Sequence, residues 1–420
     1  MNAGGEVIEK ALAQLAGQAF TPITFSFGWV AYSLTAAMRV FGDPKLMPNV
    51  DFPCMVVSGS GQRDNCSWIL ARILRDFEYW MPKEVQEEYD EMVKKRPEIK
   101  ELKPSHSLLP RFGSFFGEKR RRVGLCISVF EISGNHIGQP TKDPIFYSGI
   151  MVIILQVVIA AVPLMRTRDY IPLVVTVAAI SLCLVHSSLP QWRAEKWNGR
   201  RIGEGKDKGR TVSLVTGNGA KHVLVIICRH NAFNLEDMAS PSEPQGVNVH
   251  FTRVVVALLA CAWLAFLITV AGIQENSWFI LASGFIGMAH NLVVAAFPRE
   301  PKAFGMPLEY KECIAEPKVM QALMNLDEKY PSVGEPLVRI FFPGGLRPGE
   351  AKYWEERRNA RTSGSRNRKA ELDPAQTISQ DRVQAGTTSK PDIPAQTIPH
   401  YRAQGETTPN TDIPVSSLQS

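Results

Sequence analysis

Two uncharged stretches, IFYSGIMVIILQVVIAAVPLM at residues 145–165 and YIPLVVTVAAISLCLVHSSLP at residues 170–190, decide the fold of this 420-residue chain. Only RTRD, residues 166–169, separates them. A helix needs about 20 apolar residues to cross the hydrocarbon core of a bilayer, at a rise of about 1.5 Å per residue. Because lipid satisfies no backbone polar group, two such stretches with so short a link predict a helical hairpin through a membrane.

Three further apolar stretches bring the prediction to five transmembrane helices. Together the predicted spans cover residues 19–41, 145–165, 170–190, 254–273 and 278–297. The predicted fold class is therefore an α-helical multi-pass membrane protein. Residues 1–18 are predicted to be a short N-terminal tail, which lacks the basic start and small-residue cleavage site of a secretory signal.

The polar connectors predict a small mixed α/β domain. The first insert, residues 42–144, carries strand patterns at 54–58 and 123–132 and helix patterns at 64–81 and from 83 to about 96. The second insert, residues 191–253, carries a hairpin pattern, with strands at 211–216 and 222–228 around a Gly-Asn-Gly turn. After the last span, residues 298–358 carry a strand pattern at 308–314 and helix patterns at 318–330 and 349–358. We expect the strands of all three segments to share one sheet.

The C-terminal segment, residues 359–420, has the polar composition of a disordered tail. It contains a tandem repeat of 20 residues, at 374–393 and 394–413. Two polar copies cannot build a solenoid core, so a duplicated flexible tail is the simpler interpretation, and a linear motif read twice by a partner is the alternative.

Charges beside the spans predict the orientation. The face that carries the long inserts holds most of the juxtamembrane cations, which include Arg39, Lys45, Lys142, Arg193, Lys196, Arg200, Arg201, Arg253, Arg299 and Lys302. The positive-inside rule places the inserts and the C-terminus in the cytosol, and five spans then place the N-terminus on the lumenal or extracellular side. The predicted location is the endoplasmic reticulum or the plasma membrane. The sequon at Asn65 is expected to carry no glycan, unless the topology is inverted.

Few polar residues in the predicted spans could carry chemistry. The spans contain no Asp, Glu or Lys, and the best candidates are His290 with Asn291, and His186. Polar groups inside a membrane are expensive and are often functional, but hydrogen bonding between helices is the simpler explanation. The absence of paired carboxylates and of inverted repeats argues against a secondary transporter.

The soluble segments contain no HExxH, GxSxG or kinase motif. Seven scattered cysteines without a CxxC pair argue against a disulfide framework and a zinc site, so we predict no metal and no cofactor. Lys119, Arg120, Arg121 and Arg122 form a basic run that could contact anionic lipid headgroups. The net charge of +6 is modest, and a tethered chain makes nucleic acid an unexpected partner.

Several short motifs stand out in the chain: SFGWVAYS at 26–33, RDNCSWIL at 63–70 with RDFE at 75–78, LPQWRAEKW at 189–197, GNGAKH at 217–222, AFPR at 296–299 and FPGGLRP at 342–348. Together they resemble a family of ascomycete integral membrane proteins without assigned activity. The resemblance covers about residues 20–358 and leaves out the repeated tail. Some members accompany fungal secondary-metabolite gene clusters, so the resemblance implies an accessory membrane role and supplies no catalytic residues.

These observations favour a membrane anchor or scaffold for cytosolic or membrane-bound biosynthetic enzymes over an enzyme. The first alternative is a membrane-embedded enzyme that acts on a lipophilic substrate, with His290, Asn291 and His186 around its pocket. The second alternative is export of a metabolite, which predicts intracellular accumulation when the gene is deleted.

Overall fold

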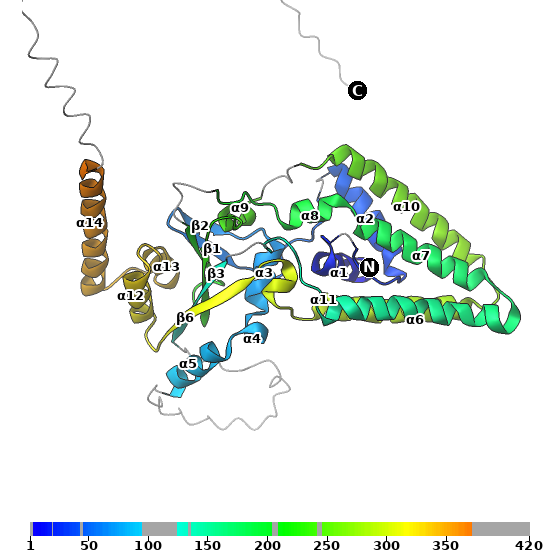
Figure 1. Cartoon of the computed structure of the whole chain (residues 1–420), viewed down its shortest axis with the longest axis horizontal. Coiled ribbons are helices and arrows are strands. Elements are labelled where there is room, and N and C mark those ends of the chain that lie inside the picture. The colour runs from blue at the N-terminus through cyan, green and yellow to red at the C-terminus, as the bar shows by residue number, and fades with distance from the viewer. Residues whose placement is uncertain are drawn as a thin grey trace, which may run out of the picture. The chain divides into compact units, whose positions relative to one another are not determined.

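The computed structural model describes residues 3–18, 20–42, 45–94, 124–132, 136–203, 209–241 and 246–371. It divides into two compact units, Met1–Leu346 and Arg347–Ser420, and each is described here by itself. The first unit contains an apolar helical bundle and a sheet with its covering helices (Figure 1).

The bundle contains the helices that are long and apolar enough to cross a membrane. In the described part of the chain three helices meet this condition alone: α6 (Pro144–Thr167), α10 (Val249–Ala271) and α11 (Ser277–Ala296). A fourth crossing results if α7 (Ile171–Ser187) and α8 (Pro190–Lys196), which bend by 42° at their junction, form one span. Large apolar side chains are exposed along these helices, as a lipid-facing surface requires, among them Met151, Val158, Val174, Leu258, Ile268, Phe285 and Leu292.

Two antiparallel hairpins build this bundle (Figure 1). The α6–α7 turn follows Arg168, which adopts the left-handed conformation at φ 55°, and the α10–α11 turn uses Asn276 in the same way at φ 53°. The side-chain amide of Asn276 donates to the Asp169 carboxylate at 2.8 Å, so a hydrogen bond joins the two turns. The predicted hairpin of residues 145–190 is therefore present as α6 and α7.

The predicted first span, residues 19–41, is wrong as a continuous helix. The structure has instead α1 (Ala3–Leu15), an extended segment, and α2 (Gly28–Gly42). Proline lacks a backbone N–H and disfavours helix in the residue before it, so Pro22 interrupts the apolar stretch. The 15 residues of α2 extend about 22 Å, which is shorter than the hydrocarbon core.

The predicted N-terminal tail is also corrected, because α1 is a buried helix. Its side chains at Ile8, Ala11 and Leu12 are fully buried. Figure 1 shows α1 among the bundle helices, and it packs against α2 and α11. The apolar pattern of residues 7–16 thus reports packing inside the bundle and not a solvated end of the chain.

Six strands from three separate segments form one mixed sheet, in the order β2-β1-β4-β5-β3-β6. The strands are β1 (Met55–Ser58), β2 (Gly61–Asp64), β3 (Leu125–Ile132), β4 (Arg210–Val215), β5 (His222–Cys228) and β6 (Leu308–Glu316). Only β3 and β5 are parallel, with Cys126 opposite His222, and all other neighbours are antiparallel. The expectation that both inserts and the segment after the last apolar helix share a sheet is confirmed.

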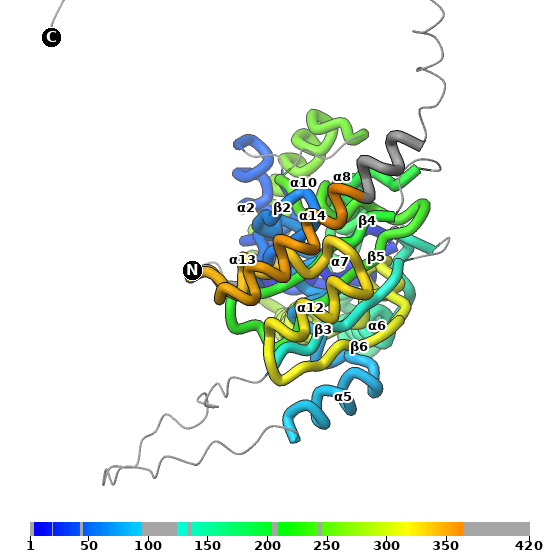
Figure 2. Tube along the Cα trace, turned by 90° about the vertical axis from the view of Figure 1, so that its left-hand side faces the viewer, coloured from blue at the N-terminus to red at the C-terminus, as the bar shows by residue number. Residues whose placement is uncertain are grey.

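Short helices cover the sheet. They are α3 (Trp68–Arg75), α4 (Phe77–Trp80), α5 (Lys83–Lys94), α9 (Leu235–Ala239), α12 (Val319–Lys329) and α13 (Gly334–Phe341), with a 3-10 turn at Pro301–Phe304. Both α5 and α12 contact the edge strand β6 (Figure 2). The predicted helix at 64–81 is broken at Asp76, whose carboxylate accepts hydrogen bonds from Arg75 Nε at 2.6 Å and from the Arg299 backbone N–H at 3.2 Å.

The second unit contains α14 (Pro348–Glu371). The predicted start of the disordered tail at residue 359 is therefore wrong, because residues 359–371 continue a helix. Arg, Glu, Lys and Ala in this stretch are strong helix formers. The tandem repeat at 374–393 and 394–413 lies outside the described residues.

Candidate functional site

An extended segment, residues 20–27, runs into the interior of the bundle between α1 and α2. The side chains of Thr21, Ile23, Thr24, Phe25 and Ser26 are fully buried. An extended chain makes no helical hydrogen bonds of its own, so its backbone N–H and C=O groups need partners on the surrounding helices. The polar residues of the bundle supply them.

Three glycines make room for this segment. A Cβ atom on Gly287 would lie 1.7 Å from the carbonyl oxygen of Phe25, and one on Gly149 would lie 2.2 Å from the carbonyl oxygen of Pro22. A Cβ atom on Gly284 would lie 2.5 Å from the Phe27 ring. Any larger residue would push the extended segment out of its place, so α6 and α11 accept it only where they carry glycine.

Gln156, in the middle of α6, pairs with both backbone groups of Phe25. Its side-chain amide donates to the Phe25 carbonyl at 2.7 Å and to the Ser283 carbonyl at 2.8 Å, and its amide oxygen accepts from the Phe25 N–H at 3.3 Å. The Ser283 hydroxyl donates in turn to the Gln156 carbonyl at 3.2 Å. This side chain therefore replaces the β-ladder that an extended strand would otherwise need.

Asn291 of α11 pairs with the backbone carbonyl and the side-chain hydroxyl of Thr24. Its amide donates to the Thr24 carbonyl at 3.0 Å, and its oxygen lies 2.9 Å from the Thr24 hydroxyl. The indole N–H of Trp29 donates to the same carbonyl at 3.0 Å. The Thr24 hydroxyl also lies 3.0 Å from the Gly287 carbonyl, so its single proton serves one acceptor at a time.

His290 lies beside this network and is half-buried. Its Nε2 is 3.0 Å from the Ser148 hydroxyl, and its Nδ1 is 3.4 Å from the Thr24 hydroxyl. The Ser148 hydroxyl donates to the Ile145 carbonyl at 2.8 Å, so its oxygen is left to accept from His290. This pattern assigns the proton of the neutral imidazole to Nε2.

His186 is separated from the other two candidates. It is fully buried on α7 beside Trp29 and Tyr32, with ring centroids 5.6 and 5.0 Å away. Both of its ring nitrogens, and the Tyr32 hydroxyl, have no hydrogen-bond partner among the described residues. The structure thus joins His290 and Asn291 through Thr24, whereas His186 lies against the Trp29 and Tyr32 rings and makes no hydrogen bond with them.

The chemistry of this network favours a structural role. Gln156 and Asn291 form hydrogen bonds with backbone groups of Phe25 and Thr24. These backbone groups would be costly to leave unpaired in an apolar interior. Ser148 and His290 have the spacing of a nucleophile and a base, but the Nδ1 side faces a threonine instead of an orienting carboxylate, and the serine proton is held by a helix carbonyl. Sequence reasoning found Asn291 and His290 and missed Thr24 and Ser148, which are common residue types without a motif.

Buried cations lie at the end of the bundle where the chain continues into the sheet segments. Lys196 is fully buried, and its ammonium group donates to the carbonyls of Gln14 at 3.1 Å and Ala16 at 2.8 Å, at the C-terminal end of α1. Arg299 donates to the Gln14 carbonyl and to the Asp143 carboxylate, both at 2.6 Å. Cations are favourable at a helix C-terminus, where the carbonyls lack helical partners. We call Lys196, Arg299 and Arg72 the junction cations.

The third junction cation, Arg72 of α3, connects the sheet side with α11. Its guanidinium donates to the Ala295 carbonyl at 3.2 Å and to the Asp51 carboxylate at 2.7 Å. Burial lowers the pKa of Arg72 to about 10, while Asp51 opposes this shift, so the side chain stays charged at neutral pH. Sequence reasoning used Lys196 and Arg299 only to predict the orientation and missed that their positions next to helix ends indicate buried contacts, and it assigned no role to Arg72.

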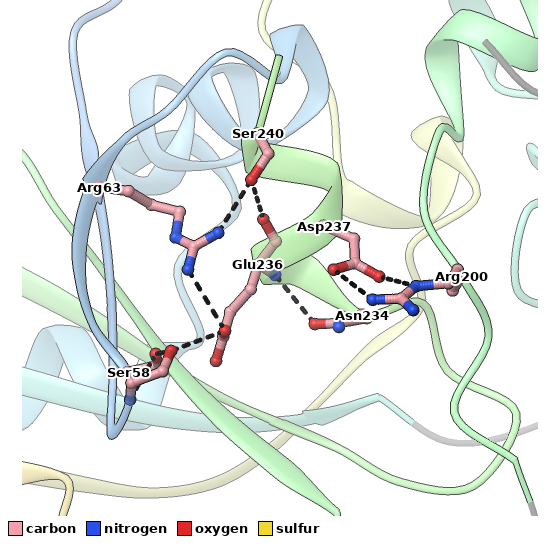
Figure 3. Close-up of polar contacts among 8 residues, drawn as sticks. Ser58, Arg63, Arg200, Asn234, Glu236, Asp237 and Ser240 are labelled. Atoms are coloured by element: carbon pink, nitrogen blue, oxygen red, sulfur yellow. Dashed lines mark hydrogen bonds and ion pairs between the residues drawn. The ribbon is translucent and has the colours of Figure 1, made fainter. Parts of the chain in front are cut away.

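A surface cleft of about 410 Å³ lies between α8 and α9, and a polar network extends from its wall (Figure 3). Arg200 pairs with Asp237 at 2.7 Å, and Arg63 lies 3.8 Å from Glu236 and donates to Ser240 at 2.9 Å. The hydrogen bond from Arg200 lowers the pKa of the Asp237 carboxyl group. Both carboxylates already have an arginine partner, so this network supplies no free acid or base. The cleft is lined by Ala194, Trp197, Asn198, Gly199, Arg200, Asp237 and Ser240.

Two predicted surface features have different outcomes. Asn65 is buried, its amide donates to the Ser67 carbonyl at 2.8 Å, and its oxygen accepts from the Ser67 N–H at 2.9 Å. These bonds leave no room for a glycan on the folded chain, and the unmodified state of Asn65 stays a prediction. The basic run of Lys119, Arg120, Arg121 and Arg122 lies outside the described residues. No group of metal-ligating side chains is found in the described part of the chain.

Comparisons with known protein families, with curated proteins and with solved structures find no match to this chain.

Proposed function

We propose that this chain is an integral membrane anchor that holds its sheet and covering helices at the cytosolic surface of a bilayer, as a scaffold for cytosolic or membrane-bound enzymes. The apolar surfaces of α6, α7, α10 and α11 support insertion into lipid. The resemblance to the ascomycete membrane proteins suggests enzymes of secondary-metabolite biosynthesis as the partners to test.

The observation that carries the proposal is the construction of the sheet. Its strands come from the chain between α2 and α6, from the chain between α8 and α10, and from the chain after α11. Every one of these segments is tied to the bundle at one or both ends, and two buried hydrogen bonds, from Arg72 to the Ala295 carbonyl and from the Arg299 N–H to the Asp76 carboxylate, add links between the two parts. A domain that only needed tethering would require one link, whereas this one is held in a fixed position.

The same construction revises the proposed topology. If α6, α7 with α8, α10 and α11 are four crossings, the insert before α6 and the residues after α11 share one side of the membrane. Lys142, Arg193, Arg253 and Arg299 lie on this side and support a cytosolic assignment. In this proposal α1 begins inside the bundle, where Gly4 lies next to Gly28 and Met288, so no first span carries the N-terminal segment to the lumenal side.

Cysteine labelling tests this topology in sealed microsomes. Cys66 is exposed between β2 and α3, so a membrane-impermeant maleimide should label it without detergent. The variant Cys66→Ser is the control and should lose this labelling. Labelling of Cys66 only after the membrane is opened would refute the cytosolic position of the sheet.

The scaffold role is tested by metabolite profiling of cells that lack the gene and are complemented with variants. At equal protein levels, Ser148→Ala, His290→Ala and His186→Ala should restore the wild-type profile, because the proposed role uses none of these side chains chemically. Intracellular accumulation of a finished product in the deletion strain would support export instead.

The close approach of Ser148 and His290, at 3.0 Å, favours one second candidate, a membrane-embedded hydrolase or acyltransferase that acts on a lipophilic ester. In that case Ser148→Ala would abolish turnover while the variant protein remained folded and abundant. The profiles of the same complemented strains therefore distinguish the two functions.

A further inference from the structure

Two cysteines lie next to each other on neighbouring strands of the sheet, far from the polar network of the bundle. The sulfur atoms of Cys126 on β3 and Cys313 on β6 are 3.3 Å apart. In the antiparallel ladder Cys126 lies opposite Ala315, and Cys313 lies opposite Ser128, so the two cysteines are diagonal neighbours. Both are free thiols. The pairing of β3 with β6 shifts register between Val129 and Phe130, close to the Ser128–Cys313 pair, as at a β-bulge.

The surroundings favour one thiolate in this pair, on Cys126. The hydrogen bond with Cys313 lowers the pKa of Cys126 against the opposing effect of burial, and His222, its partner on β5, adds to the lowering. The same hydrogen bond, together with burial, raises the pKa of Cys313. The His222 ring is held between the rings of Phe77 and Tyr89, with centroids 5.3 and 5.0 Å away. The pair therefore carries one proton and one negative charge when Cys126 ionises, and the 3.3 Å contact between the sulfurs lets the proton pass from Cys313 to Cys126.

The two sulfurs differ in access. Cys126 is fully buried, whereas Cys313 is partly exposed. Cys313 lines a surface pocket of about 380 Å³ between β6 and the helices α5 and α12, together with Glu88, Asn325 and Lys329. A small molecule in the pocket can therefore reach the sulfur of Cys313, while the sulfur of Cys126 is shielded from the pocket by burial.

We propose that Cys126 and Cys313 form a redox-active pair, an oxidation site that takes a small hydroperoxide through this pocket. Cys313 passes its proton to the Cys126 thiolate across their contact, and the resulting Cys313 thiolate attacks the outer peroxide oxygen, so that a sulfur–oxygen bond forms, the peroxide O–O bond breaks, and an alkoxide or hydroxide leaves. The leaving oxygen takes the proton of the Cys126 thiol, the Cys126 thiolate attacks the sulfenic sulfur, a disulfide forms and hydroxide leaves. The thiol–thiolate pair loses two electrons in total, and one hydroperoxide is reduced.

The disulfide would link the edge strand β6 covalently to β3. The two cysteines are 187 residues apart in the chain, so the closed loop includes every helix of the bundle from α6 to α11. Constraining so long a loop reduces the freedom of the unfolded chain. A thiol reductant would reverse the bond, which makes the stability of the sheet depend on the redox state.

The test uses the full-length protein in detergent, reduced and then freed of reductant. Hydrogen peroxide is added at neutral pH, remaining thiols are alkylated, and the peptides are mapped by mass spectrometry without reduction. We expect a linked peptide pair that contains Cys126 and Cys313, two hydrogens lighter than the sum of its reduced members, which disappears after treatment with dithiothreitol. On a non-reducing gel the oxidised protein should migrate faster than the reduced protein.

Three variants make the result decisive. Cys66→Ser, which removes an exposed thiol elsewhere, should leave the linked pair unchanged. Cys126→Ser should abolish the linked pair. In this variant Cys313 should instead accumulate a sulfenic acid, which dimedone traps. Size-exclusion chromatography checks that the variant remains folded. Cys313→Ser keeps the native buried thiol and should leave Cys126 largely unoxidised under the same conditions. The proposal is overturned if Cys66 is oxidised while Cys126 and Cys313 stay reduced, or if Cys313 goes directly to sulfinic acid in the wild-type protein.

Discussion

The substitution Gln156→Leu should destabilise the bundle by about 2 to 4 kcal/mol. The side chain makes three hydrogen bonds, two of which satisfy the N–H and C=O of Phe25 in the extended segment. Hydrogen bonds between segments inside a membrane protein contribute roughly 0.6 kcal/mol each on average and up to about 1.7 kcal/mol. Leucine has nearly the same size, so the loss comes from the two backbone groups left unpaired, each of which costs about 1 to 3 kcal/mol. Part of this cost overlaps with the lost hydrogen bonds, and therefore the two contributions are not summed.

Unfolding of the purified protein by titration with sodium dodecyl sulfate in mixed micelles measures this loss as a free energy. A difference of 2 kcal/mol corresponds to roughly a thirtyfold change in the unfolding equilibrium constant. The matched control is Leu155→Met, on the same helix turn, because Leu155 is exposed on the outer surface of α6 and should change stability by less than about 0.5 kcal/mol. If Gln156→Leu behaved like this control, the extended segment would not depend on Gln156, and our account of the interior would be refuted.

Three further substitutions test other parts of the structure. Gly287→Ala should destabilise the protein by about 3 kcal/mol or more and reduce the yield of folded protein, because its Cβ would lie 1.7 Å from the Phe25 carbonyl oxygen. The control Gly272→Ala, whose Cβ would have its nearest atom at 3.5 Å, should fold normally. Equal yields of the two variants would contradict the close approach at Gly287. Arg299→Met should cost about 3 to 5 kcal/mol, because it leaves the Asp143 carboxylate without its partner, and limited proteolysis should then cut between the sheet and the bundle earlier than in the wild type. Glu131 should stabilise the sheet at neutral pH but not in acid. The hydrogen bond from Arg229, and to a smaller extent that from Lys311, lowers the pKa of its carboxyl group in the folded chain. The stabilisation is therefore present above the unfolded pKa of 4.5 and is lost as the pH falls through the lower folded value. The melting temperatures of the wild type and Glu131→Gln should therefore differ at pH 7 and converge near pH 3, and a constant difference would argue against this ion pair.

Local sequence patterns were sufficient for the elements whose partners are close in the chain. The two uncharged stretches that meet at residues 166–169 predicted the hairpin of α6 and α7, because length and apolar composition are properties of each stretch alone. The Gly-Asn-Gly turn predicted the β4–β5 hairpin in the same way, since turn residues and flanking alternation specify this pairing. The helix at 64–81 was only partly predicted, because Asp76 breaks it through a hydrogen bond with Arg299, more than 200 residues away in the chain.

What the sequence by itself determined was the class of protein: apolar helices, a mixed sheet built from the polar connectors, and the absence of a recognisable catalytic motif. Pro22 already disfavours a single helix over residues 19–41, but only the tertiary structure decided that residues 23–27 stay extended, because this segment is stable only where Gln156 and Asn291 replace its missing backbone partners and where glycines leave room for it. It also decided which polar residues meet: His290 with Thr24 and Ser148, and Cys126 with Cys313. The physical reason is that hydrogen bonds and thiol contacts act over about 3 Å in space, and periodicity along the chain carries no information about pairs that folding brings together from distant positions.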